Sequence, residues 1–91
     1  MSKKLILALA VLSLFAVTPA LADGKEDCTT DPVASWKPVT DAEAAAKTAG
    51  YEVRKSKTEG TCYEVYGVKD GKNYELFYHP VTLELLATEE S

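Results

Sequence analysis

The sequence predicts an α+β domain in which one helix packs on a three- to four-stranded antiparallel meander, cross-linked by one disulfide. Three observations lead to this fold class. A capping sequence at Thr40 opens an alanine-rich segment, Asp70-Gly71 interrupts alternating apolar and polar residues, and two cysteines, Cys28 and Cys62, lie far apart in the chain. These features are typical of a helix, a hairpin and a covalent link between distant segments.

Residues 1–22 have the pattern of a signal peptide. Lys3 and Lys4 precede an apolar run from Leu5 to Val17, and Ala20-Leu21-Ala22 provides the small residues of a signal-peptidase site. As a helix the run would be about 20 Å long, shorter than the roughly 30 Å hydrocarbon core of a bilayer. We therefore expect cleavage after Ala22 and a periplasmic or secreted bacterial protein whose mature form is not embedded in the membrane.

The mature chain is expected to be acidic. The 91 residues have a formal net charge of −4, and loss of Lys3 and Lys4 with the signal peptide takes it to −6. Nucleic acids and anionic lipids are poor partners for such a surface. A single core in so short a chain supplies only about 3–5 kcal/mol. We expect one small monomeric domain that needs a covalent link and has no nucleic-acid partner.

Cys28 and Cys62 are expected to supply that link. An even pair of cysteines in a small exported domain is most simply a disulfide. Closing a loop of about 35 residues contributes roughly 3–4 kcal/mol in the chain-entropy model. Reactive thiols and metal ligation are the alternatives.

The chain divides into an irregular N-terminal arm over residues 23–39 and a folded domain over residues 40–91. Prolines in the arm remove backbone donors and disfavour helix in the residues before them. The capping box Thr40-Asp41-Ala42-Glu43 and a C-cap at Gly50 predict a helix over about 41–49. Four alanines recur at helical spacing and form a narrow stripe suited to close packing on a sheet: Ala42, Ala45, Ala46 and Ala49.

Strands are predicted from residue 51 onward. The Asp70-Gly71 turn opposes Val65 to Leu76 on the core face and Glu64 to Phe77 on the outer face. It also places Tyr63 opposite Tyr78 on the core face.

The preceding hairpin is expected to have a three-residue loop, Thr58-Glu59-Gly60, which sets Val53 against Val65 and Lys55 against Tyr63. The same register places Arg54 opposite Glu64 on the outer face. A two-residue loop at Glu59-Gly60 would turn Val53 outward, so the apolar pattern favours the longer loop. After Pro80 a last short strand is expected over Leu83–Ala87, with its pairing left open.

The residues available for catalysis are few. The chain has one histidine, His79, and the serines after residue 22 are in no recognisable motif. No glycine-rich phosphate loop or His-Glu-x-x-His pattern occurs. The sequence therefore predicts a protein that is not an enzyme and has no cofactor.

A metal site is an alternative for the cysteines. The predicted register places Cys62 opposite His79, and Cys28 could join them as a third ligand for zinc or copper. In the competing interpretation His79 caps the strand end before Pro80 while Cys62 stays in its disulfide.

The outer face of the sheet supplies the candidate partner-binding residues: Arg54, Glu64, Tyr66 and Phe77. Such a mixture of aromatic and charged side chains either binds a partner or is covered by the arm. Because Cys62 has the same outward orientation, we favour partial cover by the arm. An unprotected edge strand could also accept an extended peptide.

Taken in order, several segments form a pattern: Gly50-Tyr51-Glu52-Val53, Cys62-Tyr63-Glu64-Val65-Tyr66-Gly67, Asp70-Gly71-Lys72, Tyr74-Glu75-Leu76 and Pro80-Val81-Thr82. This pattern resembles the PepSY-like domain family over about Trp36 to Leu86. The family's last turn usually reads Asp-Pro-x-Thr-Gly, whereas His79 and Leu83 stand at the acid and glycine positions here. This departure leaves the final turn and the fourth strand open.

The resemblance implies a small module of one helix and an antiparallel sheet, found in peptidase propeptides and in secreted or membrane-associated bacterial proteins and proposed to restrain peptidases. It carries over no catalytic residues. We expect a noncatalytic exported binding module that acts on a peptidase or another envelope protein. The alternative is a periplasmic protein that binds a metal or small ligand through Cys62 and His79 or through the outer aromatic face.

Overall fold

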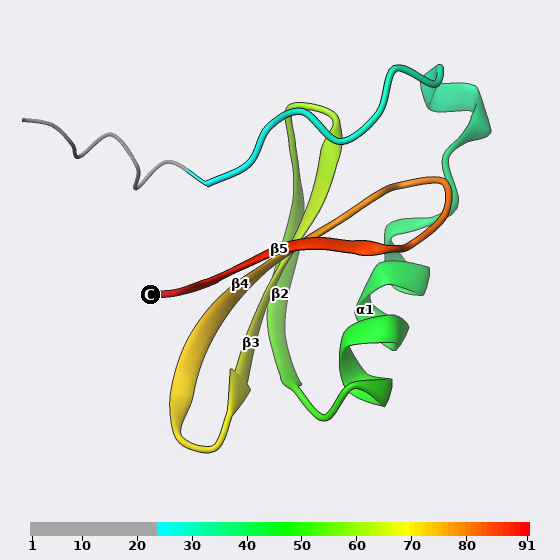
Figure 1. The fold of residues 1–91 in the computed structure, drawn as a ribbon. Coiled ribbons are helices and arrows are strands. Elements are labelled where there is room, and N and C mark those ends of the chain that lie inside the picture. The colour runs from blue at the N-terminus through cyan, green and yellow to red at the C-terminus, as the bar shows by residue number, and fades with distance from the viewer. Residues whose placement is uncertain (1–23) are drawn as a thin grey trace, which may run out of the picture.

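The structure, a computed structural model, describes residues 24–91, so the predicted signal peptide and its cleavage site lie outside the described residues. The elements in chain order are η4 (Val33–Ser35), α1 (Val39–Thr48), β2 (Glu52–Glu59), β3 (Cys62–Lys69), β4 (Lys72–Tyr78) and β5 (Leu85–Glu90). All four strands form one antiparallel sheet in the order β2-β3-β4-β5. Helix α1 lies against one face of this sheet (Figure 1). The predicted α+β fold class is confirmed.

Helix α1 starts at Val39, two residues before the predicted start. Its N-cap is Pro38, which has an extended backbone (φ −61°, ψ 147°) and makes no side-chain capping hydrogen bond. The predicted capping box at Thr40 is therefore wrong, because Thr40 already lies inside the helix. Glu43 instead accepts a hydrogen bond from the Ser56 hydroxyl of β2. The C-cap prediction holds: Gly50 has φ 98° and its N–H donates to the Lys47 carbonyl at 2.9 Å.

The core lies between α1 and the sheet. Ala42 and Ala46 are fully buried, as the alanine stripe predicts, and small side chains let the helix approach the strands closely. The core also contains two aromatic and two aliphatic side chains from β3 and β4: Tyr63, Val65, Leu76 and Tyr78. Trp36 closes one end of this core, with its ring edge-on to Tyr63 at 5.6 Å between centroids.

The β3–β4 hairpin has the predicted register. Val65 pairs with Leu76, and Glu64 pairs with Phe77. Asp70 and Gly71 have φ values of 54° and 77°, the left-handed pair that a two-residue hairpin turn with the strands' own twist requires. The turn residues alone therefore determine which side chains of these two strands face the helix.

The β2–β3 hairpin differs from the prediction. Its turn is the two residues Gly60 and Thr61, so that Glu59 pairs with Cys62 and Ser56, not Val53, pairs with Val65. A register shift between Val53 and Lys55 inserts one extra residue into β2. This bulge turns Val53 back toward the core even though the loop is short.

The predicted pairing of Arg54 with Glu64 is consequently wrong. Arg54 sits at the bulge and its guanidinium lies 3.7 Å from the Glu52 carboxylate. Lys57 is the residue of β2 that pairs with Glu64. The two-residue turn, which sets the register from Glu59 to Lys55, thus determines which cation lies beside the buried carboxylate.

Strand β5 begins two residues later than predicted and continues to Glu90, pairing with β4 with one register shift, between the partners of Phe77 and Tyr78. The chain reaches it through a turn in which Leu83 has φ 64°, a left-handed conformation at the position where the related family has glycine. The His79 N–H donates to the Glu84 carbonyl at 2.9 Å and closes the turn. The turn therefore forms with His79 and Leu83 at the positions where they depart from the family pattern, and the fourth strand pairs at one edge of the sheet.

Candidate functional site

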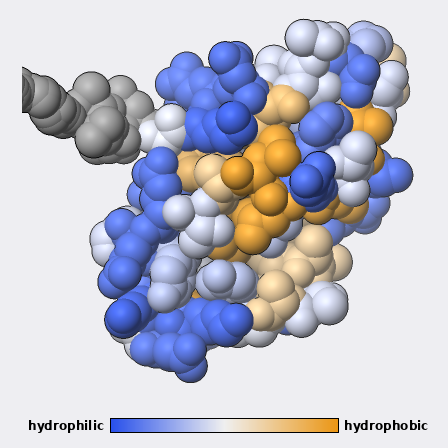
Figure 2. Space-filling model, viewed as in Figure 1, coloured by the Kyte–Doolittle hydropathy of each residue, from blue (hydrophilic) through white to orange (hydrophobic). Residues whose placement is uncertain are grey.

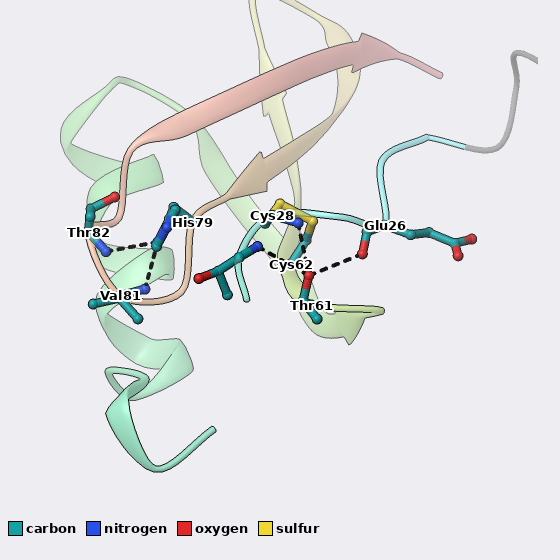
Figure 3. Close-up of a disulfide and its surroundings, with 8 residues drawn as sticks. Glu26, Cys28, Thr61, Cys62, His79, Val81 and Thr82 are labelled. Carbon is teal, nitrogen blue, oxygen red and sulfur yellow. Dashed lines mark hydrogen bonds between the residues drawn. A yellow bond between two sulfur atoms is a disulfide. The ribbon is translucent and has the colours of Figure 1, made fainter. Parts of the chain in front are cut away.

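The predicted disulfide is present and fixes the arm to the sheet. Cys28 and Cys62 are bonded, with their Cα atoms 5.0 Å apart. Thr61, in the adjoining turn, reinforces the link: its hydroxyl accepts the N–H of Cys28 at 2.9 Å and its own N–H donates to the Glu26 carbonyl at 2.9 Å (Figure 3). The covalent bond and the hydrogen bonds therefore act at the same end of the β2–β3 hairpin.

The arm covers part of the outer face of the sheet. Phe77 is 1% exposed and Cys62 is fully buried, although both point away from the helix. Gly24 packs against the tip of the Phe77 ring, where a Cβ on Gly24 would be 2.7 Å from the ring's Cζ. The predicted cover of the outer face by the arm is confirmed. Phe77 and the neighbouring Glu64, two of the candidate partner-binding residues, are buried.

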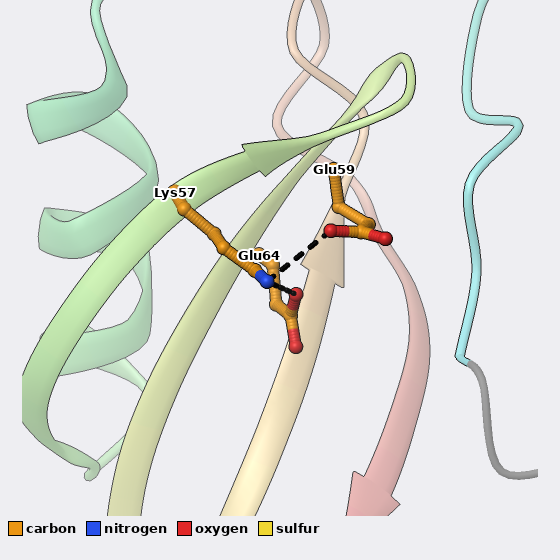
Figure 4. Close-up of polar contacts among 3 residues, drawn as sticks. All are labelled: Lys57, Glu59 and Glu64. Carbon is orange, nitrogen blue, oxygen red and sulfur yellow. Dashed lines mark ion pairs between the residues drawn. The ribbon is translucent and has the colours of Figure 1, made fainter.

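A carboxylate cluster lies next to the covered region. Lys57 extends its ammonium group toward Glu59 at 3.3 Å and Glu64 at 3.8 Å (Figure 4). The hydrogen bond and charge of Glu59 raise the pKa of Lys57. Glu64 is only 3% exposed. Its carboxylate is therefore buried on the outer face of the sheet, with Lys57 as the neighbouring cation.

Glu75 on β4 also belongs to this cluster. Partial burial raises the pKa of Glu75, and the hydrogen bond and negative charge of Glu64 raise it further, followed by the charge of Glu89. Partial burial, followed by the carboxylate of Glu64, likewise raises the pKa of the Tyr66 hydroxyl. The outer face near β4 and β5 therefore carries more negative charge than its own cations neutralise.

The other half of the outer face is open. Here a pocket of about 300 Å³ is lined by residues of β2, β3 and β4 together with Ser91: Arg54, Lys55, Tyr66, Gly67, Asn73, Tyr74 and Ser91. The ammonium of Lys55 lies over the Tyr66 ring, 4.7 Å from its centroid. Arg54 and Tyr66 are candidate residues that the structure brings together. Lys55 was missed because the predicted register turned it toward Tyr63.

His79 stabilises the turn before β5. Its Nδ1 accepts the backbone N–H groups of Val81 and Thr82, both at 3.1 Å (Figure 3). The imidazole thus occupies the acceptor position that an aspartate side chain would fill in such a turn. The capping interpretation of His79 is confirmed.

The proposed cysteine ligands of the metal alternative are joined to each other. Both sulfurs belong to the disulfide, so neither is a thiolate. Within residues 24–91 no three histidine, cysteine or acidic side chains are grouped closely enough to hold a metal ion. A second pocket, of about 660 Å³, lies beside the disulfide and is lined by Asp27–Asp31 and His79.

These features define a small α+β module whose sheet is covered on one face by a helix and half covered on the other by a disulfide-anchored arm. The family model described as the peptidase propeptide and YPEB domain matches residues 5–89, and the chain belongs to this family. No curated protein and no solved structure matches the chain. Across residues 24–91, no helix combines the length and apolar character needed to span a membrane.

Proposed function

We propose that the protein is an exported, noncatalytic binding module that restrains a peptidase. Its membership of a family described by the peptidase propeptide is the observation that carries this proposal. The apolar N-terminal run with its small-residue site supports export, and a disulfide persists in oxidising compartments such as the periplasm. The single histidine supports a noncatalytic role, because its Nδ1 accepts two backbone N–H groups.

The docking pocket for the partner is formed by Arg54, Lys55, Tyr66 and Asn73 in the open half of the outer face. Arg54 and Lys55 are exposed, while Tyr66 is half-buried and held below the Lys55 ammonium. An aromatic ring flanked by two cations and an amide suits an acidic or aromatic side chain of the partner. Aromatic residues and arginine are also enriched at the centres of protein interfaces.

A small-ligand protein is the second candidate. The docking pocket has a volume of about 300 Å³, at the lower end of the range of roughly 300–1,000 Å³ for small-molecule sites. The metal form of this alternative requires thiolates from Cys28 and Cys62, which the disulfide consumes.

The test is capture of partners from the envelope fraction of the producing cell with the processed protein, followed by assay of the captured peptidases. We expect the protein to slow at least one peptidase, and the double variant Arg54→Glu/Tyr66→Ala to lose both capture and inhibition. Lys47→Ala, which removes an exposed cation from α1, is the matched control and should act like the parent protein. Retention of a small molecule without any captured peptidase would replace the proposal by its alternative.

A further inference from the structure

The two edge strands of the sheet differ in how well they are protected. Strand β2 carries a bulge, exposed cations at Arg54, Lys55 and Lys57, and contacts with α1. Bulges and edge cations are the usual means of preventing a further strand from pairing. Strand β5, Leu85–Glu90, has one register shift near its start, between the partners of Phe77 and Tyr78, but from Ala87 to Glu90 it pairs with β4 without interruption. It contains no proline, lysine or arginine, and no other strand within residues 24–91 pairs with its free side.

The backbone of β5 presents unpaired groups at this edge. The N–H of Ser91 donates to the Asn73 carbonyl of β4 at 2.9 Å. Because hydrogen bonds in an antiparallel ladder involve every second residue, Glu89 faces β4 in the same way as Ser91. Thr88 and Glu90 therefore direct their N–H and C=O groups toward the open edge.

The side chains along β5 change character from one end to the other. Leu85, at its start, is 42% exposed, and an apolar area lies between β5 and α1 on the face shown in Figure 2. Glu89 and Glu90 lie at its other end. Glu89 pairs with Glu75, placing two carboxylates directly opposite each other on the outer face. A cation beside this pair would relieve their repulsion.

We propose that the free edge of β5 binds an extended segment of a partner protein by antiparallel strand addition, with basic residues opposite Glu89 and Glu90 followed by apolar residues beside Leu85. The unpaired groups of Thr88 and Glu90 supply the backbone hydrogen bonds, and the side chains select the order of basic and apolar residues. Antiparallel pairing is chosen because its hydrogen bonds are the more stable per residue. The proposal does not require the partner to be a peptidase, and Thr88 and Glu90 are not part of the docking pocket.

A second copy of the chain fits this edge poorly. Two β5 strands paired about a centre between Ala87 and Thr88 would place Glu90 of each copy opposite Leu85 of the other. Carboxylates would then lie against leucines. Two chains with a charge of −6 each would also repel one another.

The test uses two capped peptides of identical composition with the processed protein: Arg-Lys-Thr-Val-Ile-Val and its reverse, Val-Ile-Val-Thr-Lys-Arg. Amide hydrogen exchange is followed by NMR. We expect the first peptide at saturation to slow exchange at Thr88 and Glu90 by at least about tenfold, because these amides become hydrogen-bonded. The amides of the β2 edge should be unchanged.

Charge variants provide the second measurement. Glu89→Lys/Glu90→Lys should weaken binding of the first peptide by about tenfold, since two exposed ion pairs become repulsive. The matched variant Glu52→Lys, which reverses an exposed carboxylate on β2, should bind within about twofold of the parent. Circular dichroism of each variant reports whether the fold is retained, and the exchange measurement on the parent stands without them.

Three results would overturn the proposal. The first is unchanged exchange at Thr88 and Glu90 with millimolar concentrations of either peptide, and the second is equal binding of the reversed peptide. The third is a dimer in sedimentation with these two amides already protected, which would assign the edge to a second copy. None of these results bears on the docking pocket, whose test depends on Arg54 and Tyr66.

Discussion

The backbone N–H of Thr61 donates to the carbonyl of Glu26 at 2.9 Å, which joins the arm to a hairpin turn far along the chain. This contact requires the preceding residue to have no side chain. Gly60 has φ 60°, and a Cβ built on it would overlap the Glu26 carbonyl oxygen. The turn and the arm are therefore fitted to each other at the backbone level, next to the disulfide.

Replacing Gly60 with alanine should destabilise the protein more than replacing Gly71. Gly71 is also left-handed, with φ 77°, but a Cβ there would meet nothing within 4 Å. Gly71→Ala should cost about 1–2 kcal/mol from left-handed strain alone. Gly60→Ala carries the same strain and must also displace the arm, so we expect a larger loss of the free energy of unfolding in urea. Equal losses would contradict the fitted contact.

Removing the disulfide should lower the free energy of unfolding by roughly 3–4 kcal/mol, because the bond closes a loop with a sequence separation of 34 residues. Cys28→Ser is the preferred variant, since Cys28 is only partly buried while Cys62 is fully buried. Urea unfolding of the parent with and without reductant measures the same difference. If the variant also keeps amide protection around Phe77 unchanged, the disulfide is not what holds the arm over that ring.

His79→Ala should destabilise the turn before β5 by about 1–2 kcal/mol, since the N–H groups of Val81 and Thr82 lose their shared acceptor. His79→Asp should retain most of the stability, because a carboxylate accepts N–H groups two residues on in such turns. In the parent, nitrogen NMR should find the imidazole proton on Nε2, because Nδ1 is the acceptor. A proton on Nδ1 in the neutral ring would refute the assignment.

Glu75 should make the protein less stable as the pH rises. Burial and the neighbouring Glu64 raise the pKa of Glu75 in the folded state, so above about pH 4.3 the folded state binds more protons than the unfolded state. Stability is then lost as the pH rises through the raised pKa. Glu75→Gln should reduce this decline in urea unfolding measured from acidic to neutral pH. Glu52→Gln, at an exposed position, is the control and should leave the slope unchanged.

The β3–β4 hairpin was predictable because local chemistry fixes its geometry. Asp70 and Gly71 both take left-handed conformations, and this turn admits one register for Val65 and Leu76. The register of the β2–β3 hairpin was not predictable, because two different backbone conformations direct Val53 toward the core. A longer loop and a bulge satisfy the same apolar pattern, and nothing in the residue types near Arg54 distinguishes them.

The predictions of the helix start and of the residues lining the docking pocket were incomplete for a similar reason. In both places, contacts with residues distant in sequence determine the local structure. Glu43 could cap the helix, but it accepts a hydrogen bond from Ser56 on β2 instead. Lys55 lines the pocket because the Gly60–Thr61 turn, where Thr61 binds Glu26 of the arm, places it opposite Tyr66. Cover of the outer face was predictable because the disulfide had to carry the arm there, whereas the burial of Phe77 beneath Gly24 depends on the exact path of the arm.

The loop closed by the bond between Cys28 and Cys62 contains most of the arm, all of α1 and all of β2. A cut by a peptidase anywhere between these residues would leave two fragments that still migrate as one molecule until a reductant is added. A protein that meets peptidases in its own compartment would thus survive a single nick in this stretch with its two pieces held in place.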